Sequence, residues 1–302
     1  MKSKIGILLV ISIVIAGMAV SCEHLMAVAD IGAQIAGATG AIDQNTANAI
    51  SVSARALGSA AEEITPEQEY FIGRAVAANI LSSYRLWNGN PALTSYLNRI
   101  CAAITINSPR PDVFNGYHVA ILDSNEINAF ATSGGHIFVT RGIINAAKTE
   151  DALAGVIAHE IAHIQLQHSI KAIRTSRITQ ALMITGVSAA GAAAGMNVNE
   201  LTDVFKESVG EIVTTLVNNG YSQTQEFEAD NTAMSLLASA GYSPSGLIDM
   251  LRELSTVQTA SSGFGKTHPT PARRITNAER SVGNYRVADT RSYRQARFTL
   301  AR

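Results

Sequence analysis

His159, Glu160 and His163 form an H-E-x-x-H motif, which is the clearest chemical signal in the sequence. Residues four apart lie on one face of a helix, so the two imidazoles can bind one Zn²⁺ at about 2.0–2.1 Å each. Glu160 lies beside the first histidine, where it can act as a general base without being a ligand. The motif therefore predicts a hydrolytic zinc site with His159 and His163 as ligands and Glu160 as the catalytic base.

A third ligand is required, because catalytic zinc sites use three protein side chains. His168 does not suit this role, since it would lie about 140° round a straight helix from the nearer ligand. The acidic stretch 226–230 (E-F-E-A-D) is a better source, although by itself it would be a solvated helix face. Glu226 and Asp230 share a helical face, so we expect Glu226 to bind the metal and Asp230 to accept a hydrogen bond from a ligand histidine. Glu228 points elsewhere.

Capping signals place both sets of residues on helices. Thr149 can cap the helix that carries H-E-x-x-H, and Glu150 and Asp151 complement the helix dipole at its start. Ser222, followed three residues later by Gln225, is a capping box for the helix of the acidic stretch. The two helices must pack together to bring the ligands to one metal.

Upstream residues supply the remaining elements of the expected fold. Thr65 opens a capping box that predicts a helix over about 66–86, and a second helix follows over about 92–103. Residues 117–122 and 135–140 are predicted strands. We therefore expect an α+β fold, mostly helical, with a small β-sheet beside the H-E-x-x-H helix.

Composition excludes several classes of protein. The 302 residues carry a net charge of −1, which argues against a nucleic-acid partner. Hydrophobic residues make up 47% and charged residues 16%, so the chain is not disordered. The two cysteines, Cys22 and Cys101, exclude a disulfide scaffold and a four-cysteine metal site, and Cys101 is expected in the core.

The N-terminus has the layout of a bacterial export signal. Two lysines precede an uncharged apolar stretch, and small residues then lead to Cys22. We expect residues 1–21 to be the signal, with Cys22 resembling the lipidated cysteine of a lipobox; simple cleavage and a retained anchor remain open. Lipidation would attach the protein to a periplasmic membrane surface. Glu23, which is not the Asp of inner-membrane retention, favours the outer membrane. Residues 22–61 are expected to form an Ala/Gly-rich tether or helix.

Two further segments leave alternatives open. Residues 178–196 carry no charge and approach the length of a membrane span, but their small side chains favour a packed helix, part of a helix pair over 178–217 that covers the cleft. The C-terminal residues 273–302 contain eight arginines and two acids. We expect residues 281–302 to be a basic tail, either solvated or in contact with an anionic surface.

Four stretches in order resemble the gluzincin metallopeptidase family that includes HtpX and the CAAX prenyl endopeptidases. Two are the zinc motifs above. The third is N-A-F-A at 128–131 with G-G-H-I-F-V at 134–139, and the fourth is T-H-P at 267–269 with Arg274 behind it. The resemblance covers about 62–280 and implies a zinc endopeptidase domain there. The chain lacks the tetratricopeptide repeats of longer members, so we expect a short lipoprotein-like member.

The resemblance also implies roles outside the zinc motifs. In the family the third stretch leads into an edge strand that holds an extended substrate, here Asn128, Gly135, His136, Ile137, Phe138 and Val139. His268 is implied to lie near the zinc and Arg274 near the substrate. His268 can occupy the open zinc position, act with Arg274 as a transition-state donor, or be an ordinary loop histidine.

The expected function is a zinc endopeptidase of the bacterial cell envelope that hydrolyses extended or misfolded proteins. Its expected partners are those substrates and a membrane, reached through the N-terminal signal or a lipid on Cys22. Two alternatives remain. One is a chaperone or assembly factor that uses the fold for binding, and the other is an integral-membrane protease with a span near 178–196.

Overall fold

The computed structural model describes residues 22–45, 64–172, 220–257, 263–268 and 271–301, together with 47, 48, 50, 51, 54, 210, 213 and 214. The chain divides into two compact units. One comprises Met1–Ile64 and Lys171–Ser208, and the other comprises Thr65–Ile170 and Val209–Arg302. The expected export signal at 1–21 and the possible span at 178–196 lie outside the described residues.

In the first unit, helix α2 (Cys22–Ala38) falls within the segment expected to be a tether or helix. Among the described residues of the whole chain, no helix combines the length and apolar character needed to cross a bilayer.

The second unit is mostly helical and contains a small sheet, which confirms the expected α+β class. Its elements are α4 (Pro66–Ser83), α5 (Pro91–Thr105), β1 (His118–Leu122), β2 (Ala129–Thr132), η1 (Ser133–Gly135), β3 (His136–Thr140), α6 (Arg141–Ala146), α7 (Glu150–Gln165), α10 (Gln223–Ser239), α11 (Ser245–Val257), α12 (Phe264–Thr267), α13 (Pro271–Val282) and α14 (Arg291–Ala301). The capping boxes at Thr65 and Ser222 are present. Cys101 is buried in the core, as expected.

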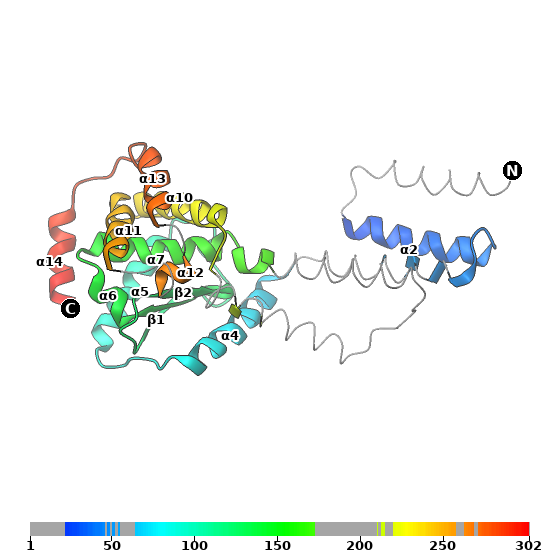
Figure 1. Cartoon of the computed structure of the whole chain (residues 1–302), viewed down its shortest axis with the longest axis horizontal. Helices are drawn as coiled ribbons and strands as arrows, with labels where there is room; N and C mark the ends of the chain where they lie inside the picture. Colours follow the sequence, from blue (N-terminus) through cyan, green and yellow to red (C-terminus); the bar gives the residue numbers. More distant parts are fainter. Residues whose placement is uncertain are drawn as a thin grey trace. The chain divides into compact units, whose positions relative to one another are not determined.

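Helix α7 is the centre of this unit, and every residue from Glu150 to Ile164 is buried. Thr149 caps it by accepting a hydrogen bond from the Ala152 N–H, as predicted. Figure 1 shows the sheet on one side of α7 and helices α10 and α11 on the other. A Cβ at Gly155 would lie 2.8 Å from the Leu247 Cα, so the close packing of α7 on α11 needs glycine there.

The three strands form a mixed sheet in the order β1-β3-β2. Strand β3 pairs with β1 in parallel and with β2 antiparallel, so its backbone groups are bonded on both sides. The prediction that this stretch supplies an edge strand is therefore wrong. Ile137, Phe138, Val139 and His136 lie in the central strand, Gly135 lies in the η1 turn, and Asn128 precedes β2. Among the described strands, β2 is the edge beside α7.

The C-terminal segment is more ordered than a solvated tail. Helix α14 packs against α5 and α7. The Arg294 guanidinium lies 2.9 Å from the Asp151 carboxylate, and Arg297 forms an ion pair with the buried Glu150. Burying two carboxylates at the start of α7 leaves them in need of cationic partners, and α14 supplies both. The expected basic tail therefore stabilises the helix that carries H-E-x-x-H.

Candidate metal centre and active site

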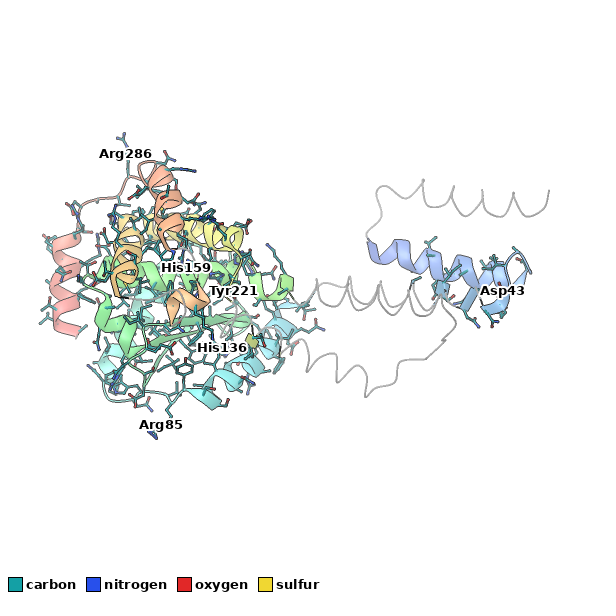
Figure 2. All side chains as sticks on the ribbon, in the orientation of Figure 1. Asp43, Arg85, His136, His159, Tyr221 and Arg286 are labelled. Atoms are coloured by element: carbon teal, nitrogen blue, oxygen red, sulfur yellow. The ribbon has the colours of Figure 1, made fainter. Side chains whose placement is uncertain are left out.

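Four side chains converge at one buried point between α7, α10 and α12. They are His159, His163, Glu226 and His268, and one ligand atom from each lies within 4.8 Å of all the others. The two α7 imidazoles approach with their Nε2 atoms 3.0 Å apart. Glu226 brings one carboxylate oxygen to 3.5 Å and the other to 3.6 Å from these nitrogens. The helical spacing predicted for the two motifs thus produces a common centre (Figure 2 labels His159).

His159 is supported from behind by charged groups. Its Nδ1 lies 3.0 Å from Asp230 Oδ1, as predicted for a carboxylate that orients a ligand histidine. Arg274 donates to both Asp230 oxygens, at 2.8 and 2.7 Å, and its Nη1 lies 2.8 Å from Glu226 Oε2. Burial raises the pKa of Asp230, but the charge and hydrogen bonds of Arg274 outweigh that effect and hold the pKa well below its usual range.

Arg274, which the family resemblance implies to lie near the substrate, is held in this structure by two carboxylates. The side chain is fully buried, and its guanidinium is engaged by the two carboxylates. An arginine in this position neutralises Asp230 and Glu226 behind the cluster, so it is a positioning residue for the metal site.

His163 is supported by a different set of residues, which sequence reasoning missed. Its Nδ1 lies 2.8 Å from His168 Nδ1, and His168 Nε2 lies 3.2 Å from Glu228 Oε2. A straight helix would carry His168 away from His163. Helix α7 instead ends at Gln165, and Gln167 takes a left-handed backbone conformation with φ 54°, which redirects the chain. His168 lies outside the candidate ligand set, as predicted, yet it contacts the candidate ligand His163.

Glu160 is buried next to the cluster but outside its set of donor atoms. Its Oε1 lies 3.4 Å from His268 Nε2. Burial raises the pKa of Glu160 to about 7, an effect that His268 opposes and Glu226 reinforces. A carboxyl group with a pKa near neutrality suits a general base, because it can both accept and return a proton at physiological pH.

His268, which directly follows α12, completes the cluster. Its Nδ1 lies 3.2 Å from His159 Nε2 and 3.1 Å from Glu226 Oε1, and its ring stacks on Phe264 at 4.2 Å. Burial alone would lower the pKa of His268, but the carboxylates of Glu226 and Glu160 raise it. The ring thus lies at the cluster, a position that both the open-metal-position and the transition-state-donor interpretations require.

Two contacts hold α12 over the cluster. The Thr267 hydroxyl donates to Asn128 Oδ1 at 3.1 Å, and the Phe264 N–H donates to the Ile127 carbonyl at 2.8 Å. Asn128 therefore anchors α12. Tyr221, another residue that sequence reasoning missed, stacks on His163 at 4.0 Å and closes a further side (labelled in Figure 2). Tyr221 belongs to no motif. The one signal in the sequence is its position directly before Ser222, the capping residue of the helix that carries Glu226.

The donor set fits a divalent metal ion. Burial and the charge of Arg274 lower the pKa of His159 to about 4, and burial lowers the pKa of His163 well below its usual value, so both rings are neutral at pH 7. Glu160 Oε1 is buried and accepts no aligned hydrogen bond from the described residues, whereas Glu226 Oε2 is already paired with Arg274 Nη1 at 2.8 Å. Two neutral imidazoles and a carboxylate around one point are the donors that catalytic zinc takes, and a cation there would satisfy these groups.

Comparison with known proteins agrees with this geometry. Residues 90–282, well over half of the chain, match the family described as Peptidase family M48. The chain belongs to this family. That membership makes it a metalloendopeptidase. The matched region contains His159, Glu160, His163 and Glu226, together with the other motifs of this M48 peptidase.

Relatives of this M48 peptidase include named metalloproteases. It is 30% identical to the metalloprotease LoiP of Escherichia coli K12 over 187 residues, which cover 61% of this chain and 69% of that protein. It is 26% identical to the beta-barrel assembly-enhancing protease of the same organism over 235 residues, covering 76% of this chain and 46% of the relative. The mitochondrial metalloendopeptidase OMA1 of Schizosaccharomyces pombe is 29% identical over 189 residues, covering 62% and 52%. The chain thus spans about half the length of the last two relatives.

Proposed function

We propose that this M48 peptidase is a zinc-dependent endopeptidase of the bacterial cell envelope that cleaves extended or misfolded proteins. The observation that carries the proposal is the buried cluster of His159, His163 and Glu226 with Glu160 beside it and outside the donor set. A structural metal site would need no such base. Zinc bound to these three side chains would polarise the scissile carbonyl and lower the pKa of water.

The chain's own residues supply the other parts of the mechanism. Glu160 accepts a proton from the attacking water and returns it to the leaving nitrogen, a role that its buried position beside the donor set supports. Asp230 and Arg274 hold His159 and Glu226 in place from behind. Because His268 and Tyr221 close the site, α12 must move before a substrate can reach Glu160.

Strand β2 (Ala129–Thr132) is the best candidate to hold the substrate. It is the edge strand next to α7 in the described sheet. Its four residues are buried in this resting form, so an extended peptide can add to it by main-chain hydrogen bonds once the covering segments have moved. Such binding depends little on side chains, which suits the removal of misfolded proteins of varied sequence. This role replaces the one expected for the β3 stretch.

An envelope location is supported by the N-terminal sequence and by one relative. The signal-like residues 1–21 and Cys22 favour a lipoprotein attached to a periplasmic membrane surface, with the outer membrane preferred. The relative named for beta-barrel assembly points the same way, because bacterial transmembrane β-barrels are outer-membrane proteins. The substrates are accordingly proposed to be envelope proteins, with no nucleic-acid partner.

The deciding experiment is digestion of unfolded casein by the purified chain from residue 23 onward. We expect cleavage that a zinc chelator abolishes and added Zn²⁺ restores. A protein that binds one zinc and suppresses aggregation of an unfolded substrate, but cleaves nothing even when His268 is replaced by Ala, would favour the chaperone alternative.

A matched pair of variants tests the proposed ligand set. Glu226→Ala removes a ligand and should strip the zinc, whereas Glu228→Ala on the same helix should still bind one zinc per chain at saturating metal. The reverse result would show that the wrong glutamate was assigned to the metal. Atomic absorption on protein dialysed against saturating Zn²⁺ gives the metal content of each variant.

A further inference from the structure

A row of three side chains runs from the proposed metal site to the surface through His163. Its Nδ1 contacts His168 Nδ1 at 2.8 Å, and the far nitrogen of His168 contacts Glu228 Oε2 at 3.2 Å. His168 is fully buried, while the Glu228 side chain is 51% exposed. Neither residue belongs to the H-E-x-x-H motif or to the ligand set.

The proton positions in this row can be assigned from the Glu228 carboxylate at its outer end. A carboxylate only accepts hydrogen bonds, so His168 Nε2 must carry a proton toward Glu228. We take His168 to be the neutral imidazole, whose second nitrogen is an acceptor, so His168 Nδ1 accepts in its bond with His163. The donor is then His163 Nδ1–H. The lone pair of His163 therefore lies on Nε2, the atom that faces His159 Nε2 at 3.0 Å.

We infer that His168 and Glu228 are positioning residues that hold His163 in the tautomer and ring orientation needed to bind a metal. The inference rests on the proposed metal site and extends it, because it assigns a function to the histidine that helical spacing excluded as a ligand. The left-handed residue Gln167 is what allows it, since the turn there returns His168 to the buried face of α7.

The two positioning residues differ in expected effect. His168 is fully buried and makes the direct bond, so its loss should weaken zinc binding by roughly 10–100-fold, as other partners of ligand histidines do. Glu228 acts one residue further away and is half-exposed, so water can replace it. Its removal should weaken zinc binding by only a few-fold.

The experiment measures the dissociation constant for Zn²⁺ by competition with a chromophoric chelator, using the full purified chain. His168→Leu removes the acceptor at similar volume, whereas His168→Asn keeps an amide oxygen near the position of Nδ1. We expect the Leu variant to bind zinc 10–100-fold more weakly than the parent, and the Asn variant to recover most of that loss. Glu279→Ala is the matched control for Glu228→Ala, because Glu279 is 46% exposed and pairs with Arg252 at 2.6 Å; it should bind zinc like the parent.

Melting of the metal-free proteins separates positioning from a purely structural role. If His168→Leu melts earlier than the parent but binds zinc with the parent's dissociation constant, the inference is wrong. If the Leu variant does not fold, the matched pair Glu228→Ala and Glu279→Ala still decides. Weaker zinc binding in Glu228→Ala alone supports the inference, and equal zinc binding in the two variants contradicts it.

Nitrogen NMR of the parent protein gives a second, independent test. We expect His163 to carry its proton on Nδ1 and His168 on Nε2, both with and without zinc. The opposite tautomer on His168 would overturn the inference. Failure of the parent chain to bind zinc would instead reject the proposed metal site itself, so the two failures are distinguishable.

Discussion

The two candidate ligand histidines on α7 are supported in contrasting ways. Behind His159 lies a fully buried ion pair, Asp230 with Arg274, which is closed off from solvent. Behind His163 lies one more imidazole, His168, whose partner Glu228 is half-exposed. We call these sets the buried arm and the open arm. They start four residues apart on one helix, yet they differ in charge and in access to water.

The difference between the arms predicts which substitutions should reduce stability and which should reduce metal binding. Buried charges are stable only when every partner is present, because removing one leaves another desolvated and unpaired. An arm that ends at the surface has no such requirement, since water can take the place of the exposed Glu228 carboxylate. The buried arm should therefore affect both folding and metal binding, whereas the open arm should affect metal binding almost alone.

The largest expected effect comes from a residue that lies between the arms and belongs to neither. Glu160→Gln should lower the rate of hydrolysis by about 10²–10⁴-fold, because it removes the proton acceptor. Both arms remain intact, so the variant should still bind one zinc per chain. Casein digestion and metal content measure the two quantities. Loss of zinc in this variant would show that Glu160 is a ligand, and parental activity would remove it from the mechanism.

Next in size is the loss of the arginine that completes the buried arm. Arg274→Leu leaves Asp230 and Glu226 buried without their cation, which should reduce the free energy of unfolding by about 3–5 kcal/mol. Denaturant titration of the metal-free protein measures it. Arg252→Leu breaks the exposed pair with Glu279 and should change stability by only about 0–1 kcal/mol. Equal effects of the two substitutions would contradict the contrast between buried and exposed charges.

The carboxylate of the buried arm should show both kinds of effect at once. Asp230→Ala should weaken zinc binding by roughly 10–100-fold, because His159 loses its hydrogen-bond partner. It should also destabilise the metal-free protein, since Arg274 loses one of its two carboxylates. In the open arm, His168→Asn should leave zinc binding and stability close to those of the parent. Titration with a competing chelator measures zinc binding, and thermal melting measures stability. An Asp230→Ala variant with unchanged stability would contradict the comparison.

The smallest expected effect concerns the residue that closes the site over both arms. His268 contacts His159 and Glu226, so we expect it to hold α12 shut in the resting form. His268→Ala should raise basal cleavage of an unfolded substrate several-fold, because more of the protein is then in the open, binding-competent state. A rate that falls with little loss of zinc would assign His268 to transition-state stabilisation instead. An unchanged rate would reject both roles.

Local sequence signals predicted the helices of the site correctly. Thr149, Thr65 and Ser222 cap helices as expected, because a cap depends only on residues within one turn. The same holds for spacing. His159 with His163, and Glu226 with Asp230, share helical faces by the period of 3.6 residues, so each pair could be aligned before its partner helix was known.

Only the tertiary structure decided the features that depend on distant partners. Strand β3 is central because it pairs with both β1 and β2. The residue pattern within one strand does not show which strands will pair with it. The burial of Arg274 is possible because Asp230, 44 residues away, supplies its counter-charge. His168 reaches His163 because one residue leaves the right-handed helical conformation, and α14 docks because Glu150 and Asp151 are buried. The sequence alone determined which side chains could form a metal site; packing determined which neighbours hold each of them, because those contacts join elements that are far apart along the chain.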